Sequence, residues 1–147
     1  MLADLETNIA ERLGAAGLTV GPALSRSEGK ALRARWRETF APGWTTWRTG
    51  ESLPEWHLFS GETLESLQGK QARARYDGSL AGNASQAVLV LSWQLFLPVR
   101  GPMPSYDVLR RIVPGDAYVI DTAWAWTIML THEEEAMGLG PYFVESV

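Results

Sequence analysis

Cysteine is absent from the 147 residues of this chain, and long hydrophobic runs are missing as well. The absence of cysteine excludes disulfide bonds, thiolate nucleophiles and cysteine-ligated zinc. No apolar stretch approaches the roughly 18 residues that a membrane-spanning helix needs. Asp4, Glu6 and Glu11 stand where a secretory signal peptide would require a basic segment. We therefore expect a soluble, cytoplasmic protein with no membrane partner.

A basic excess is also lacking. The chain has 13 Lys and Arg residues against 17 Asp and Glu residues, which gives a net charge of −4. Proteins that bind nucleic acid usually carry a basic excess that displaces counterions from phosphates, so this balance predicts no nucleic-acid partner. The glycines form neither a G-x-G-x-x-G fingerprint nor a P-loop. The sequence therefore predicts no nucleotide cradle and no cofactor.

Tryptophan, in contrast, is abundant, with seven residues in the chain. Tryptophan fills protein cores and is enriched at binding hot spots. The 46% hydrophobic and 20% charged residues are those of a globular protein, and the length is typical of one domain. No long linker divides the chain. We predict a single domain over residues 1–147 with a well-filled core, an aromatic contact surface, or both.

The first 40 residues predict two helices. Apolar residues recur at helical spacing from Leu2 to Leu13, and Gly14 ends this stripe. Ser25 and Glu28 have the spacing of a capping box, which predicts that a second helix begins there. The apolar face of the second helix consists of Leu32, Trp36 and Phe40.

Another face of the second helix is basic. Its four cationic residues recur at helical spacing and are Arg26, Lys30, Arg33 and Arg37. Like charges four residues apart destabilise a helix by about a few tenths of a kcal/mol per pair. Something must compensate for this repulsion. Acidic residues elsewhere in the chain can do so, and so can an acidic partner.

The middle of the chain predicts short elements. Residues 43–55 have the composition of a loop, and Trp56–Phe59 has that of a short aromatic strand. Ser60 stands at the N-cap position of a helical stretch that includes Leu67 and is interrupted by Gly69.

The second half of the chain has the composition of strands. Ala87–Phe96 predicts one central strand, the prolines from Pro98 to Pro104 predict a stiff connector, and Ser105 caps a short helix. The remaining predicted strands are Ala117–Asp121 and Trp126–Thr131, joined as an antiparallel hairpin, and Tyr142–Glu145. The sequence therefore predicts an α+β fold in which N-terminal helices pack on a mainly antiparallel C-terminal sheet.

The two histidines are the first candidates for chemistry. His57 and His132, together with Glu133, could bind a divalent metal ion or form a base with an orienting acid. Their spacing matches no metal-binding motif, and a histidine bonded to backbone at a strand end explains the same residues. Ser60 lies close to His57, but no G-x-S-x-G elbow surrounds it and an N-cap explains it. The residues by themselves assign no catalytic or metal-binding role.

Two stretches resemble a family of small bacterial proteins known as the domain of unknown function 4275 family. The residues that carry the resemblance are Trp56-His57-Leu58-Phe59-Ser60, Tyr118-Val119, Asp121, Trp126-Thr127, Thr131-His132-Glu133 and Gly140-Pro141-Tyr142-Phe143. The likeness covers about residues 25 to 145. This chain departs from the pattern at an additional Trp124 and in a longer segment from Glu133 to Gly138. The resemblance implies a small standalone bacterial protein with candidate binding residues at Trp56, His57, Ser60, Trp126, His132, Glu133 and Tyr142.

Two functional hypotheses follow. The first is a non-catalytic module that binds another protein, as toxin-neutralising immunity proteins do; the acidic balance and the run Glu133–Glu135 favour a basic partner. The second is a small metal-dependent or general acid/base enzyme that uses His57, His132 and Glu133. The high tryptophan content and the lack of a catalytic motif favour the binding module.

Overall fold

The structure is a computed structural model that describes residues 2–41, 66–132, 134, 138 and 140–146. Its elements, in chain order, are α1 (Leu2–Ala15), β1 (Thr19–Val20), α2 (Arg26–Phe40), β2 (Leu67–Gln68), α5 (Gly69–Ser79), β3 (Ala84–Leu91), β4 (Leu95–Pro102), α6 (Tyr106–Ile112), β5 (Ala117–Asp121), β6 (Trp126–Leu130) and β7 (Tyr142–Glu145). The described strands form one antiparallel sheet in the order β1-β4-β3-β5-β6-β7-β2. The predicted α+β fold is confirmed.

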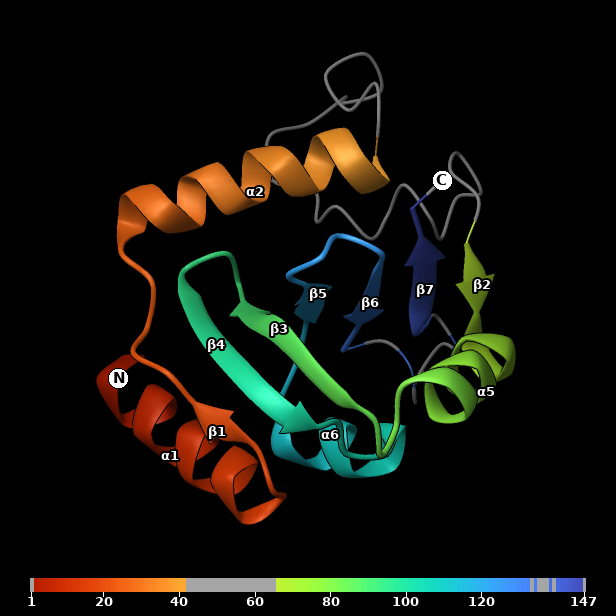
Figure 1. Cartoon of the computed structure of the whole chain (residues 1–147), viewed down its shortest axis with the longest axis horizontal. Coiled ribbons are helices and arrows are strands. Elements are labelled where there is room, and N and C mark those ends of the chain that lie inside the picture. Colours follow the sequence, from red (N-terminus) through yellow and green to blue (C-terminus); the bar gives the residue numbers. More distant parts are fainter. Residues whose placement is uncertain (1, 42–65, 133, 135–137, 139, 147) are drawn as a thin grey trace.

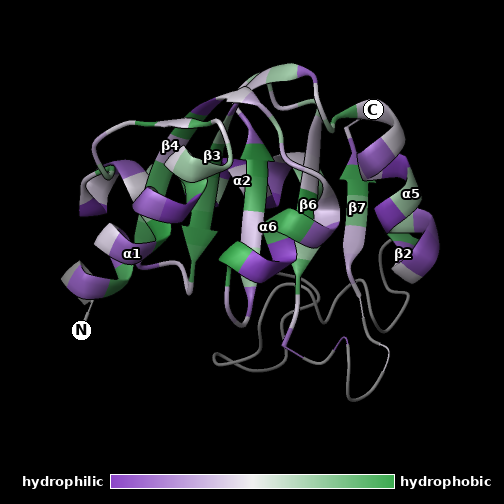
Figure 2. Cartoon of the chain, turned by 90° about the horizontal axis from the view of Figure 1, so that it is seen from below, coloured by the Kyte–Doolittle hydropathy of each residue, from purple (hydrophilic) through white to green (hydrophobic). Residues whose placement is uncertain are grey.

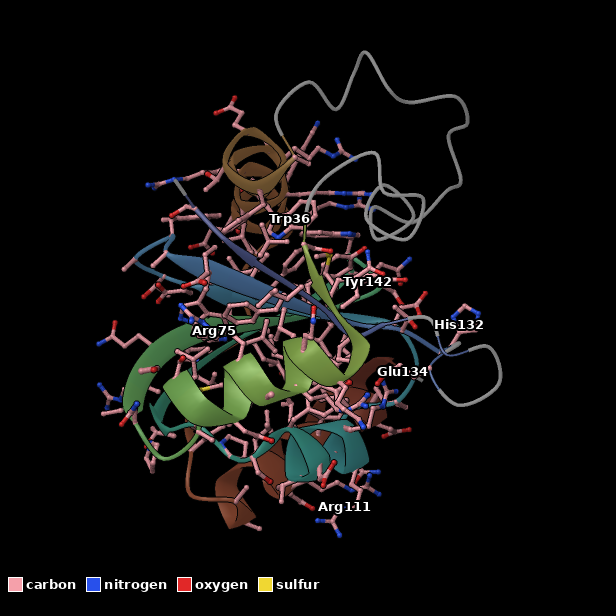
Figure 3. All side chains as sticks on the ribbon, turned by 90° about the vertical axis from the view of Figure 1, so that its right-hand side faces the viewer. Trp36, Arg75, Arg111, His132, Glu134 and Tyr142 are labelled. Carbon is pink, nitrogen blue, oxygen red and sulfur yellow. The ribbon has the colours of Figure 1, made fainter. Side chains whose placement is uncertain are left out.

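Helices cover both faces of the sheet. Helices α1, α5 and α6 lie on one face, and α2 crosses the other (Figures 1 and 3). Successive side chains of a strand point to opposite faces. In β3, Leu89 therefore joins the core under the three helices, whereas Val88 and Val90 join the core under α2. With both faces covered, the central strands are hydrophobic at nearly every position (Figure 2).

The predicted start of α2 is confirmed. Ser25 Oγ accepts a hydrogen bond from the Glu28 backbone N–H at 3.2 Å, and the Ser25 backbone N–H donates to Glu28 Oε1 at 2.9 Å. This reciprocal capping box satisfies two backbone donors that the first helical turn leaves open. The hydrogen bonds from Ser25 to its carboxylate also hold the pKa of Glu28 below its usual value.

The predicted strand over Ala87–Phe96 is wrong, because the chain reverses at Ser92–Gln94 and returns as β4. Leu91 pairs with Leu95 across this turn. The predicted connector after Phe96 is also wrong, since β4 continues to Pro102. The Pro98 carbonyl accepts a hydrogen bond from the Gly21 N–H at 2.8 Å. The nitrogen and carbonyl of one strand residue point to the same side, so the Pro98 nitrogen faces away from β3. The missing N–H of Pro98 therefore costs no hydrogen bond between β4 and β3.

Leu67 was predicted to be helical and lies instead in β2. It pairs with Phe143 at the edge of the sheet, and the helix begins only at Gly69. Gly69 has a φ of +56°, a left-handed conformation that separates strand from helix. The predicted end of α1, the Ser105 cap at the start of α6, the hairpin of β5 and β6, and the last strand are confirmed. Predictions for residues 43–65 lie outside the described residues.

None of the described helices is long and apolar enough to cross a membrane.

Candidate functional site

Two of the candidate binding residues lie in the core. The exposed fraction is 6% for Trp126 and 1% for Tyr142. Trp126 packs under the three-helix face, where its ring stacks on Phe143 with centroids 6.2 Å apart, while Tyr142 lies on the α2 face. These side chains therefore stabilise the two layers on either side of the sheet and offer little surface to a partner. Trp56, His57, Ser60 and Glu133 lie outside the described residues.

His132 lies at the surface beside Asp116. Its ring Nδ1 and its backbone N–H each lie 2.8 Å from Asp116 Oδ1, and its side chain is 57% exposed. Figure 3 shows His132 at the periphery of the molecule. An ionised Asp116 places the ring hydrogen on Nδ1, so Nε2 becomes the nitrogen that accepts a proton. This arrangement can orient an imidazole for proton transfer, and it also anchors the end of β6.

Glu134 also lies near His132, in the segment that follows β6. Its Oε2 lies 2.9 Å from Arg110 Nη1, and its Oε1 accepts from the Tyr106 hydroxyl at 2.6 Å. Arg110 also donates to the carbonyl oxygens of Thr131 and Gly115. These bonds fasten the chain after β6 to α6, which is a structural role for Glu134.

A pocket of about 440 Å³ lies between these groups, lined by Arg73, Tyr106, Asp107, Arg110, Gly115, Thr131, His132 and Glu134. Its lining contains two guanidinium groups and two carboxylates, so the pocket has no strong excess charge of either sign. Among the described residues, no three side chains of His, Asp or Glu come together as a metal site. The predicted grouping of His132 with His57 and Glu133 stays a prediction.

Alkaline solution is expected to destabilise the folded protein through Tyr76 and Tyr106. Burial raises the pKa of both phenols, and for Tyr106 the hydrogen bond to Glu134 raises it further. A pKa raised in the folded state contributes stability that is complete below about pH 10, the unfolded pKa, and is lost as the pH rises toward the folded value. Urea unfolding between pH 8 and pH 11 should show this decline, and the decline should be shallower in Tyr106→Phe. An equal slope in the two proteins would contradict this assignment.

A larger groove lies on the opposite face, between α2 and the β3–β4 turn. It has a volume of about 780 Å³ and is lined by Arg26, Gly29, Lys30, Arg33, Trp93, Gln94 and Phe96. Three of the four residues of the predicted basic stripe therefore share one groove with an aromatic wall. The Arg33 guanidinium lies over the Trp93 ring, 5.0 Å from its centroid, which is a cation–π arrangement.

The charge of this groove is only partly balanced within the described part of the chain. None of the ion pairs between described residues involves Arg26 or Lys30, and both side chains are exposed. The sequence allowed acidic residues of the same chain to balance the basic stripe. No described acid forms an ion pair with Arg26 or Lys30. Their positive charge faces solvent at the rim of the groove.

Sequence reasoning missed Trp93 and Asp116, which the tertiary structure adds to these two places. Asp116 directly precedes β5, and the register of Ala117 with Leu130 brings it next to the residues that follow β6. The hairpin prediction contained this signal, because residues flanking paired strands are themselves neighbours. Trp93 was hidden by the prediction of one continuous strand, which placed it in a sheet instead of at a turn.

Comparisons of this chain with protein-family models, curated proteins and solved structures find no match. The resemblance to the domain of unknown function 4275 family stays a prediction.

Proposed function

We propose that this protein is a non-catalytic binding module that docks an acidic segment of another protein in the groove beside α2. The observation that supports this proposal is the pair Arg26 and Lys30, two exposed cations on the rim of a groove with an aromatic wall. An interface needs a desolvated centre with charged groups around it, and this groove combines Phe96 at its buried base with cations at its edge.

Local charge favours a different partner from the one that the net charge suggested. The net charge of −4 led us to expect a basic partner. Docking, however, depends on the potential where the two surfaces meet, and α2 carries five basic residues against two acidic ones, Glu28 and Glu38. Complementary charge steers association and suppresses partners of the wrong sign. We therefore favour an acidic partner for this surface.

Occlusion is the mode of action that such a surface supports. A small domain that neutralises a toxin by covering its active surface needs a rigid docking face. It does not need to make or break a covalent bond. Helix α2 is rigidly held, because Trp36 and Phe40 are buried in the core beneath it. The alternative, a general acid/base enzyme, draws its support from His132 and Asp116 on the other side of the molecule.

Photocrosslinking can identify the partner and test the surface together. A benzophenone amino acid at position 30 on α2 should capture an acidic protein from the source organism, whereas one at position 70 on α5 should not. Lys70 is a suitable control because it is also exposed and its helix covers the opposite face of the sheet.

Charge reversal then measures the contribution of the two cations to affinity. The double variant Arg26→Glu and Lys30→Glu should bind the purified partner at least about 10-fold more weakly, because two attractions become repulsions. The double variant Arg12→Glu and Lys70→Glu has the same net charge and changes exposed residues of α1 and α5. Isothermal titration should show near-normal affinity for this control. Equal losses in the two variants, or equal crosslinking from both positions, would refute docking on α2.

A further inference from the structure

Trp93, which forms the aromatic wall of the groove, lies in a turn with an unfavourable backbone conformation. Ser92 and Trp93 at the β3–β4 turn have φ values of 54° and 50°, in the left-handed region. Turns with two consecutive residues at positive φ favour Asn-Gly, since other residues are strained there by about 1 kcal/mol or more. Strained residues that persist cluster at functional sites. A tryptophan in this strained conformation indicates that the place of its side chain in the groove is retained at the expense of a more stable turn.

Core contacts hold Trp93 in place. Its ring centroid lies 4.8 Å from that of Tyr118, 5.8 Å from that of Trp36 and 6.3 Å from that of Phe96. The Arg33 guanidinium over the ring adds a further contact. Trp93 is nevertheless only partly buried and lines the groove. It is therefore a pre-positioned aromatic surface, the kind of surface that provides a binding hot spot at little cost in entropy.

The spacing of the cations defines what would fit beside this ring. Arg26 and Lys30 are four residues apart, which is about 6 Å along a helix that rises 1.5 Å per residue. In an extended peptide, side chains two residues apart point the same way and lie about 6.6 Å apart. Two carboxylates at positions i and i+2 of an extended segment would therefore match Arg26 and Lys30. Arg33 and Trp93 come next along the groove.

We infer that the groove recognises an extended protein segment with acidic residues at i and i+2 and an aromatic residue two positions beyond this pair. The carboxylates bind Arg26 and Lys30, and the aromatic side chain packs against the partly exposed ring of Trp93. This inference rests on the proposed function and specifies the partner's recognised sequence. A short acidic segment suits the protein better than a long polyanion, because the chain as a whole has a net charge of −4.

Peptide selection tests this recognition sequence. Random twelve-residue peptides are displayed, selected on the full-length protein and counter-selected on the double variant Arg26→Glu and Lys30→Glu. The expected result is enrichment of acidic pairs at i and i+2 with an aromatic residue two positions from the pair. Failure to enrich any peptide over the variant, or enrichment of a different pattern, would overturn the inference.

A mutant cycle on the best peptide then assigns the aromatic contact to Trp93. Replacing the peptide's aromatic residue with alanine should weaken binding to the natural protein about 10-fold or more, and to Trp93→Leu by less than about 2-fold. Trp93→Phe should retain the preference. The cycle compares the affinities of two peptides for the same protein. A general loss of affinity in Trp93→Leu would weaken both peptides equally and leave their ratio unchanged. Equal preferences in the natural protein and Trp93→Leu would refute the contact.

The outcomes separate this inference from the proposed function. If the crosslinked partner depends on Arg26 and Lys30 but selection yields acidic peptides without an aromatic residue, the inference fails and the proposed function stands. If neither protein nor peptide binding depends on these cations, both fail. If oligothymidylate, used as a competitor, binds more tightly than every selected peptide, both fail in favour of a nucleic-acid ligand.

Discussion

Replacing Trp36 with alanine is expected to lower the free energy of unfolding by about 3–5 kcal/mol, the usual cost of deleting a large buried aromatic side chain. Trp36 has an exposed fraction of 0% and lies between α2 and the sheet (Figure 3). Its Nε1 donates to Thr127 Oγ1 at 3.1 Å, and this hydroxyl in turn donates to the Val119 carbonyl at 2.9 Å. The side chain thus links α2 to the sheet both by apolar packing and by a hydrogen bond.

Urea unfolding followed by circular dichroism measures this loss. Trp36→Phe keeps an aromatic ring but leaves Thr127 Oγ1 without the indole donor, so we expect an intermediate loss of about 1–3 kcal/mol. Thr127→Val removes the acceptor instead. The losses of the single and double variants should not add, because both remove the same hydrogen bond. A loss below about 1 kcal/mol for Trp36→Ala would show that α2 is not held by this residue.

Replacing Gly29 with alanine is expected to destabilise the protein by about 1–3 kcal/mol, the range for overfilling a packed site. A Cβ atom at this position would overlap the Phe96 ring. The ring has little room to move, because Phe96 is buried and its neighbour Trp93 is packed on Tyr118. Helix propensity acts in the opposite direction, since alanine is better than glycine in a helix by about 1 kcal/mol. The overlap should dominate.

Gly78 supplies the matched control. It also lies within a helix, α5, but a Cβ atom there would meet nothing within 4 Å. Gly78→Ala should therefore stabilise the protein by about 0.5–1 kcal/mol in the same urea experiment. A lower free energy of unfolding for Gly29→Ala and a higher one for Gly78→Ala would support close packing of α2 on β4. Stabilisation by both substitutions would mean that α2 lies farther from the sheet than the structure indicates.

Much of the fold could be predicted where the signal is local. The capping box at Ser25 and Glu28 acts over three residues, and the apolar strand composition of Ala117–Asp121 and Trp126–Leu130 extends over five. Prediction failed where distant residues decide. Leu67 has a neighbourhood that suits a helix, yet pairing with Phe143 makes it a strand. The turn at Ser92–Gln94 lacks the usual Asn-Gly signal, so a hairpin was interpreted as one strand.

The candidate sites show the same division. The basic stripe follows from helical spacing alone, and the sequence predicts it correctly as one face of α2. Its neighbour Trp93 lies about sixty positions away in the chain, and only the packing of α2 on β4 brings Arg33 over its ring. Similarly, His132 was a candidate from composition, but its partner Asp116 depends on the register of β5 and β6.

The sequence by itself determined the α+β class, the positions of the first two helices and the last three strands, and the basic face of α2. These features depend on caps, turns and periodic burial, which act between residues close in the chain. Only the tertiary structure decided which face of the sheet α2 covers, that Trp126 and Tyr142 are core residues, and that the basic face adjoins Trp93. Such placements arise from packing between distant segments, where the burial of large aromatic side chains outweighs the local preferences of the chain.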